Sequence, residues 1–263
     1  MSRRACGDYL GVSPSPRGLH WYLEDSSLMM PFNPNPMAKT AIVLLSGGLD
    51  SSTVLYQAQA DGYTCHAISF DYQQRHRREL DAARAIAQAA AVQTHQVVQF
   101  DLSQWGGSAL TDSSLNLPGD RSLAEMAQDI PITYVPARNT IFLSFALALA
   151  EVQQAERIYI GVNALDYSGY PDCRPDYIHA MQEAFRLGTK QGREGTPIII
   201  QTPLINLKKT EIIQLGNQLG VPWEKTWSCY AGGEVACGVC DSCKLRRAAF
   251  DALNLTDPIP YAQ

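Results

Sequence analysis

The sequence contains no apolar stretch long enough to span a membrane as a helix. Its most apolar helix-like stretch, residues 141–150, reaches about half the ~20 residues that a bilayer requires. The first residues, Met-Ser-Arg-Arg, are not followed by the apolar region of a secretory signal peptide. We therefore expect a cytoplasmic protein with no membrane partner.

Positive charge is also scarce. The chain has 21 Lys and Arg residues against 26 Asp and Glu residues, which gives a formal net charge of −5. Broad binding to nucleic acid depends on a basic surface that neutralises phosphates, so we expect no nucleic-acid partner. A small anionic ligand in a locally basic pocket is still compatible with this composition.

The cysteines do not form the even-numbered framework of a secreted, disulfide-rich domain. There are seven, and four lie close together as Cys229-x7-Cys237-x2-Cys240-x2-Cys243. In a reducing compartment this spacing favours four thiolates around one metal ion, with zinc preferred and an iron–sulfur cluster as the alternative. Because four protein ligands leave no open position for water, we predict one structural zinc ion per chain.

Residues 1–37 differ in composition from the rest of the chain. They contain five prolines and show no sustained helix or strand period. We expect a disordered N-terminal extension, and we expect a chain that starts at Met37 to keep its activity. We divide the remainder into an α/β domain over residues 38–222 and a zinc-binding segment over residues 223–263 that packs on it.

From residue 40 onward, apolar runs alternate with helix-like runs, and no internal repeat is visible. The strand-like runs are residues 41–45, 64–70, 95–100, 157–162 and 198–201, and the helix-like runs are residues 51–60, 77–91, 139–154, 176–187 and 209–219. This alternation predicts a doubly wound, mostly parallel sheet with helices on both faces. In such a sheet the ligand binds beyond the carboxyl ends of the strands, where the strand order reverses.

A glycine-containing loop directly follows the first strand-like run. It reads Ser46-Gly47-Gly48-Leu49-Asp50-Ser51-Ser52 and leads into a helix. Backbone N–H groups and the positive end of a helix bind anions in this arrangement, and glycines let a phosphate approach closely. Asp50, Ser51 and Ser52 can cap the helix or reach phosphate oxygens and a bound Mg²⁺. The alternative is an ordinary glycine turn that an aspartate caps.

Residues 161–176 form a second candidate for ligand binding. They follow a strand-like run and include Asp166, Tyr167, Tyr170 and Asp172. Aromatic side chains suit a flat ligand, and a carboxylate suits the paired N–H donors of a guanine-like edge. Which tyrosine covers the ring face and which aspartate binds the edge is left open, with Asp172 preferred. A solvent-exposed turn is the alternative.

Two further segments carry cations near strand ends. Val135-Pro136-Ala137-Arg138-Asn139 precedes a helix, so we predict Asn139 as its N-cap and place Arg138 toward phosphate. Lys209 follows Thr202-Pro203-Leu204 after the last strand-like run. Each could be a solvated charge on its own, but together they would neutralise an anionic ligand.

These segments resemble known enzymes. The loop at residues 46–52 is similar to the pyrophosphate loop of the ATP pyrophosphatase superfamily, and it lacks the Gly-Lys-Ser/Thr ending of a Walker loop. All the segments above, together with Thr226-Trp227-Ser228-Cys229-Tyr230, resemble the 7-cyano-7-deazaguanine synthase family over residues 40–254. The family usually has Tyr-Gly-Gln-Arg-His where this chain has Tyr72-Gln73-Gln74-Arg75-His76. Gln73 thus replaces the residue that a close backbone approach would need.

The resemblance implies an ATP-dependent ligase of queuosine precursor biosynthesis. Its substrates would be ATP, 7-carboxy-7-deazaguanine and ammonia, and its products 7-cyano-7-deazaguanine, AMP and pyrophosphate. It implies Mg²⁺ with ATP, a nucleotide site at residues 46–52, and catalytic contributions from Asp50, Lys209 and Arg138. A homodimer is left open.

Other functions compatible with the loop are a tRNA-thiolating or lysidine-forming enzyme and an amide ligase such as NAD synthetase. The net charge of −5 disfavours the RNA modifiers, and the chain length leaves no room for a glutaminase domain. A non-catalytic nucleotide-binding protein that docks a partner through its zinc segment is an alternative of a different class.

Overall fold

The computed structural model describes residues 39–126, 130–164 and 170–262. The predicted N-terminal extension therefore lies outside the described residues. Residues Met37–Gln263 belong to one compact unit. No helix in these described ranges is both long and apolar enough to cross a bilayer.

Five parallel strands form one sheet in the order β3-β2-β1-β4-β5. Their bounds are β1 Thr40–Leu44, β2 Thr64–Asp71, β3 Thr94–Gln99, β4 Arg157–Tyr159 and β5 Ile199–Gln201. The order reverses between β1 and β4, so the loops after these two strands leave the sheet side by side. This topology confirms the predicted fold class.

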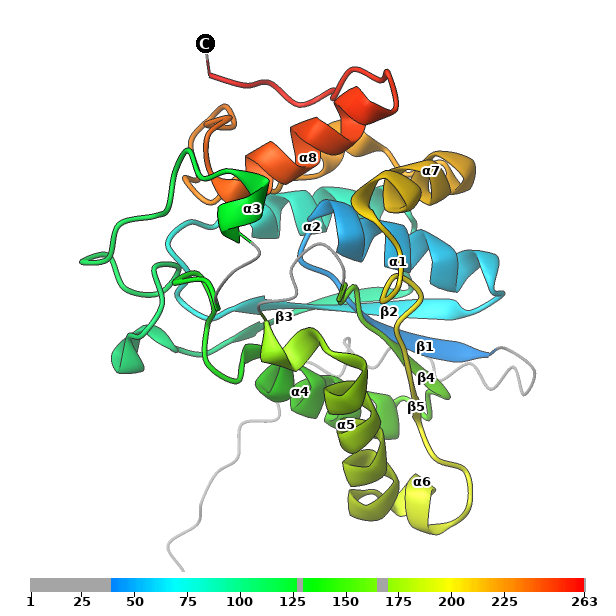
Figure 1. Ribbon diagram of the computed structural model, residues 1–263. Helices are drawn as coiled ribbons and strands as arrows, with labels where there is room; N and C mark the ends of the chain where they lie inside the picture. The colour runs from blue at the N-terminus through cyan, green and yellow to red at the C-terminus, as the bar shows by residue number, and fades with distance from the viewer. Residues whose placement is uncertain (1–38, 127–129, 165–169, 263) are drawn as a thin grey trace, which may run out of the picture. The chain divides into compact units, whose positions relative to one another are not determined.

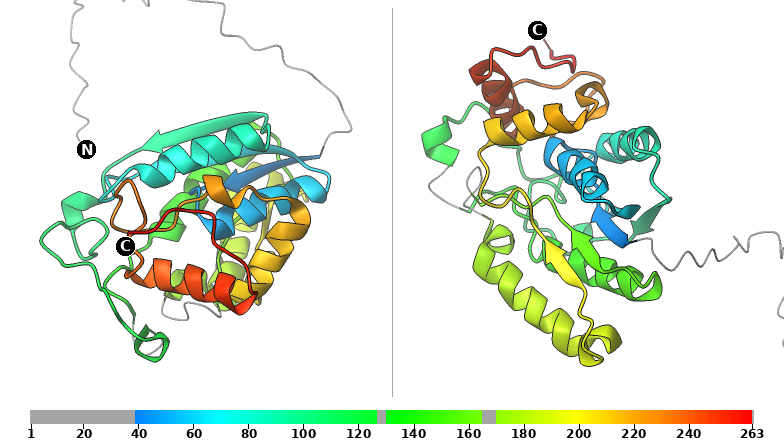
Figure 2. Two further views of the ribbon diagram at one scale, coloured as in Figure 1. Left: turned by 90° about the horizontal axis from the view of Figure 1, so that it is seen from above. Right: turned by 90° about the vertical axis from the view of Figure 1, so that its right-hand side faces the viewer.

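Helices cover both faces of the sheet, as Figures 1 and 2 show. The longer described helices are α1 Leu49–Ala60, α2 Arg78–Ala89, α4 Arg138–Val152, α5 Pro175–Gly188, α7 Lys209–Leu219 and α8 Asp241–Ala252. The shorter pieces are η2 Ser103–Trp105, α3 Leu123–Met126, η3 Pro171–Cys173, α6 Lys190–Arg193 and η4 Trp223–Lys225. In Figure 1 the helices α1, α2, α7 and α8 lie on one side of the sheet, and α4 and α5 lie on the other.

The central strand β1 shows why the sequence builds two layers. Its side chains alternate between faces, as strand geometry requires. Ala41 and Val43 join the apolar core under α1, α2 and α7, whereas Ile42 and Leu44 join the core under α4 and α5. Because both faces are covered, the strand is apolar at consecutive positions rather than at alternate ones.

The C-terminal segment has a small apolar cluster of its own. Trp227, Ala236 and Ile259 pack there with three of the four clustered cysteines. The Arg246 side chain, only 2% exposed, donates from its Nε and Nη2 atoms to the carboxylate of Asp257 at 2.7 and 2.9 Å. This ion pair fastens the last residues of the chain to α8.

Candidate functional site

A cavity of about 300 Å³ opens beyond the carboxyl ends of β1 and β4. The loop after β1 lines one end, together with Lys209 from α7. The lining also includes the aromatic side chains of Phe70, Tyr72, Phe142, Tyr170 and Tyr230, and we call the part of the cavity that they line its aromatic end. The predicted ligand site at the point of strand reversal therefore coincides with a real cavity.

The glycine-containing loop is closed by its own hydrogen bonds. The backbone N–H of Ser46 donates to Ser51 Oγ at 3.1 Å, and Ser51 Oγ donates to the carbonyl of Gly48 at 3.2 Å. Gly47 has a φ of 82°, and a Cβ there would lie 2.4 Å from the backbone nitrogen of Ala83. Only glycine fits at position 47, because helix α2 packs directly against the loop.

Helix α1 begins at Leu49 and directs its N-terminus into this loop. No side chain caps its first turn, so backbone N–H groups stay available to an anion. The Ser52 hydroxyl is fully buried and has no hydrogen-bond partner in the described part of the chain. Ser52 does not line the cavity, whereas Asp50 and Ser51 do. The uncapped N–H groups beside these two residues fit a site that a phosphate completes.

Lys209 and Asp50, which both line the cavity, form an ion pair. The Lys209 Nζ atom lies 2.8 Å from both carboxylate oxygens of Asp50. Lys209 is the first residue of α7 and Asp50 is the second residue of α1. The structure thus brings together two of the three predicted catalytic residues, which are 159 positions apart in the sequence.

Arg138, the third of these residues, lines the aromatic end of the same cavity. Burial alone would lower the pKa of its guanidinium, but the neighbouring Tyr72, Tyr170 and Asp172 outweigh this effect and raise it. Arg138 therefore keeps its positive charge. The Arg138 guanidinium also lies 5.9 Å from the centre of the Phe142 ring.

The prediction that Asn139 caps helix α4 is wrong. The N-cap is Ala137, with a φ of 55°, and Asn139 is the second helical residue. The backbone N–H of Asn139 instead donates to the Asp172 carboxylate at 3.1 Å, and its side-chain amide donates to the Asp172 carbonyl. An aspartate 33 residues away supplies the acceptor that a local cap would otherwise provide.

This contact also shows what surrounds Asp172. The residue is 6% exposed and does not line the cavity. Tyr170 does line it, and its hydroxyl lies 2.9 Å from Thr133 Oγ1. Asp166 and Tyr167 lie outside the described residues. The role of these four residues in binding a ring edge or face stays a prediction.

Glu79 is a cavity-lining residue that the sequence analysis missed. It lies in the first turn of α2 and is partly buried. Burial raises the pKa of its carboxyl group to about 7, although Arg138 favours the charged form and Cys229 opposes it. In the sequence it looks like an ordinary acidic residue at a helix start, so no local signal marked it.

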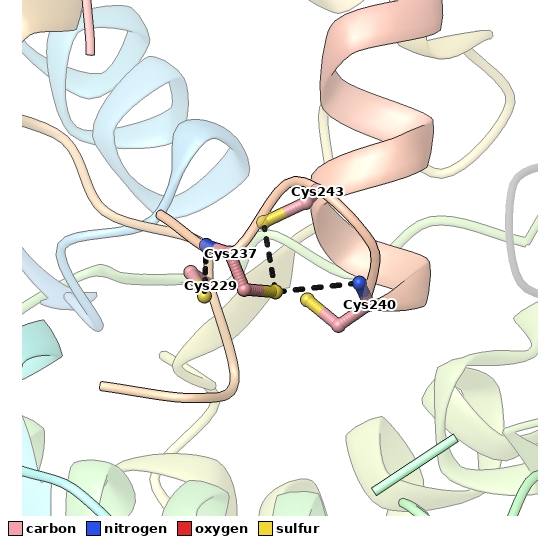
Figure 3. Close-up of side chains that lie close together, drawn as sticks. All are labelled: Cys229, Cys237, Cys240 and Cys243. Atoms are coloured by element: carbon pink, nitrogen blue, oxygen red, sulfur yellow. Dashed lines mark hydrogen bonds between the residues drawn. The ribbon is translucent and has the colours of Figure 1, made fainter. Parts of the chain in front are cut away.

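The four clustered cysteines meet at one point, as predicted (Figure 3). Their Sγ atoms all lie within 4.8 Å of one another, and those of Cys237 and Cys243 are 4.0 Å apart. Tetrahedral zinc with Zn–S bonds of about 2.3 Å places its sulfur atoms about 3.8 Å apart, so the cluster fits this ion. The hydrogen bond with Cys229 raises the pKa of Cys240, and a bound cation would favour its thiolate form.

The fold and the cavity together define a parallel α/β protein with an anion-binding loop and a cysteine cluster suited to a metal ion. The family model described as "Queuosine biosynthesis protein QueC" matches residues 40–254. The chain belongs to this family, and the matched range confirms the resemblance seen in the sequence.

Relatives over most of the chain carry the name 7-cyano-7-deazaguanine synthase. The relative from Nostoc punctiforme is 76% identical over 222 residues, which cover 84% of this chain and 99% of the relative. The relative from Thermosynechococcus vestitus is 70% identical, over 84% of this chain and 95% of the relative. The relative from Hydrogenovibrio crunogenus is 57% identical, over 85% of this chain and 96% of the relative.

Solved structures show a more remote similarity. NMN synthetase from Francisella tularensis aligns with a TM-score of 0.44 and 16% identity, over 84% of this chain and 80% of that chain. The NH3-dependent NAD synthetase from Campylobacter jejuni aligns with a TM-score of 0.39 and 15% identity, over 72% of this chain and 67% of that chain. Similarity at this level concerns the fold alone.

Proposed function

We propose that this protein converts 7-carboxy-7-deazaguanine and ammonia to 7-cyano-7-deazaguanine and consumes ATP, releasing AMP and pyrophosphate. Membership of the family and the name of the relatives support the reaction. The observation that carries the proposal is the composition of the cavity. The same cavity is lined by the anion-binding loop, by several aromatic side chains and by the guanidinium-bearing Arg138.

In this proposal ATP binds with its phosphates on residues 46–52. The N–H groups of the loop and of the first turn of α1 bind the phosphate oxygens. Lys209 turns from Asp50 to the phosphates, and Asp50 is then the residue that would hold Mg²⁺. The bound Mg²⁺ would neutralise charge on the phosphates.

The 7-carboxylate of the substrate attacks the α-phosphorus of ATP, and pyrophosphate leaves. Ammonia attacks the resulting acyl-adenylate to give the amide and AMP. The amide oxygen attacks a second ATP, pyrophosphate leaves again, and loss of AMP with two protons from nitrogen gives the nitrile. This chemistry requires in-line positioning and charge stabilisation more than a protein nucleophile.

The residues of the cavity divide these tasks. Lys209 stabilises negative charge on the phosphates, while Arg138 orients the substrate carboxylate toward the α-phosphorus. Tyr170 covers the face of the deazaguanine ring. Asp172 acts indirectly in this scheme, because it holds the start of α4 and with it Arg138.

Zinc has a structural role in the proposal. Cys229, Cys237, Cys240 and Cys243 would hold it with a full set of four protein ligands. A full coordination shell leaves no position for a reacting group, so the ion contributes folding energy.

The test is to measure AMP and pyrophosphate with the purified, zinc-loaded protein. We expect both products when ATP, ammonia and 7-carboxy-7-deazaguanine are present together, with two ATP consumed per nitrile. Omission of the deazaguanine acid should abolish their release. Equal AMP release without the acid, or release that depends on added tRNA, would overturn the proposal.

A further inference from the structure

The cavity contains one carboxylate that the proposed function does not use. Of the described residues that line it, two are acidic, Asp50 and Glu79. Asp50 is already ion-paired with Lys209 through both of its oxygens. The side chain of Glu79 has no hydrogen bond and no ion pair within the described residues.

Glu79 lines the cavity together with Arg138 and Tyr72. The charge of its carboxylate interacts with Arg138 and Cys229, and it helps to raise the pKa of Tyr72. The carboxylate therefore lies within electrostatic reach of two residues that would surround a flat ring.

The position of Glu79 is fixed by tertiary packing. The carbonyl oxygen of Glu79 lies only 2.5 Å from the point where Gly47 would carry a Cβ. The first turn of α2 is thus in backbone contact with the phosphate loop. This packing fixes the backbone of Glu79, so a ligand has to order only its side chain.

A partly buried carboxylate without a partner lacks the hydrogen bonds that such groups normally make. The proposed substrate offers complementary chemistry, because a guanine-like ring carries a ring N–H and an exocyclic amino group on the same edge. Two parallel N–H groups match the two oxygens of a carboxylate. Arg138, which lines the same cavity, matches the 7-carboxylate.

We propose that Glu79, and not Asp172, accepts hydrogen bonds from the N–H edge of the deazaguanine and determines specificity for it. This inference rests on the proposed function and identifies how the same site selects its substrate. Asp172 is less suited to the role, because its carboxylate already accepts from Asn139 and lies outside the lining of the cavity.

The test compares two ligands and three proteins by calorimetry. The ligands are 7-carboxy-7-deazaguanine and the analogue that lacks its 2-amino group, each bound in the presence of α,β-methylene ATP so that no turnover occurs. The proteins are the zinc-loaded full chain, Glu79→Gln and Asp81→Asn. Asp81 is the matched control, because it lies in the same helical turn but its side chain is 74% exposed and outside the cavity.

We expect the wild-type protein to bind the amino-bearing ligand about tenfold to 100-fold more tightly than the analogue. Glu79→Gln should lose this preference, because a carboxamide offers one acceptor oxygen where the carboxylate offers two. Asp81→Asn should retain it. The affinity for α,β-methylene ATP alone should be the same in all three proteins, and one cooperative melting transition in each, at a temperature no lower than that of the wild type, would show that the variants are folded.

Three results would overturn the assignment. If Glu79→Gln keeps the preference, another residue binds the edge, and loss of the preference in Asp172→Asn, measured as a fourth protein, would identify Asp172. If Glu79→Gln loses nucleotide affinity instead, Glu79 belongs to the phosphate or Mg²⁺ site. If it binds both ligands as the wild type does but turns over more slowly, Glu79 transfers a proton. In each case the wild type still forms the nitrile, whereas a wild type that binds neither ligand would refute the proposed function itself.

Discussion

The backbone N–H of Trp227 donates a 2.9 Å hydrogen bond to the carbonyl oxygen of Gly47. Trp227 stands two residues before Cys229, and Gly47 is the first glycine of the anion-binding loop. The metal-binding segment and the phosphate loop are therefore directly connected through backbone. Loss of the metal should therefore weaken nucleotide binding, and not only lower the stability of the C-terminal segment.

Removal of one cysteine ligand tests this connection. Cys240→Ser should reduce zinc from one ion per chain to a small fraction, lower the melting temperature by several degrees, and weaken ATP binding. Elemental analysis, thermal melts and calorimetry measure the three effects. Cys65→Ser is the control, because Cys65 is buried away from the cluster and its loss should leave the zinc content at one. Iron with a visible charge-transfer band in the wild type would exclude zinc as the resident metal.

Asp50→Ala tests the nucleotide site. The substitution removes the partner of Lys209 and the residue assigned to Mg²⁺, so AMP formation should fall at least ~100-fold. Asp50 is about a third exposed at the side chain, which is why the melting temperature should change little. Asp81→Ala, outside the cavity, should keep full activity. Near-normal turnover in Asp50→Ala would show that the loop does not bind the reacting nucleotide.

Gln73 is expected to store backbone strain. It adopts a φ of 61°, the left-handed region that residues with a Cβ enter at a cost, and the family usually has glycine at this position. Gln73→Gly should therefore raise the free energy of unfolding by about 0.5–1 kcal/mol in denaturant titrations. Gln73→Ala keeps the Cβ and should not stabilise the protein. Equal effects of the two substitutions would show that the side chain, and not the backbone, matters here.

The pKa of Glu79 predicts a pH effect on stability. Burial raises this pKa from 4.5 to about 7, so between these values the folded protein holds a proton that the unfolded chain releases. The stability from this group is present below pH 4.5 and is lost as the pH rises through about 7. Glu79→Gln does not titrate, so it should gain about 2–3 kcal/mol relative to wild type between pH 5 and pH 8. Denaturant titrations of the zinc-loaded proteins measure this difference, and a difference that does not vary with pH would contradict it.

The sequence predicted those parts of the site that are carried by short contiguous motifs. Ser46 to Ser52 and the closely spaced cysteines sit next to one another in the chain, so local geometry alone brings their groups together. The five strands were also predictable, because both faces of the sheet are covered and the central strand β1 is a continuous apolar run. The bounds of the strands differ from the predicted ones by at most three residues, as for β4, which ends at Tyr159 rather than at residue 162.

The residues that the sequence analysis misjudged depend on tertiary contacts. Asn139 is of a residue type that often caps helices. In the structure, however, the carboxylate of Asp172, 33 residues away, accepts a hydrogen bond from the start of the helix. Glu79 enters the cavity only because Gly47 lets α2 pack against the loop. Neither contact leaves a pattern in the local sequence, because each joins segments more than 30 positions apart.

The ion pair between Arg246 and Asp257 has a practical consequence for how the protein is handled. Arg246 also lines the cavity, so Asp257, six positions before residue 263, helps to hold part of its wall. Deletion of the residues that include Asp257 would leave the buried guanidinium of Arg246 without its counterion, which strongly lowers the free energy of unfolding. Shortened versions should therefore retain Asp257, and purification tags at this end are best joined through a flexible spacer after Gln263.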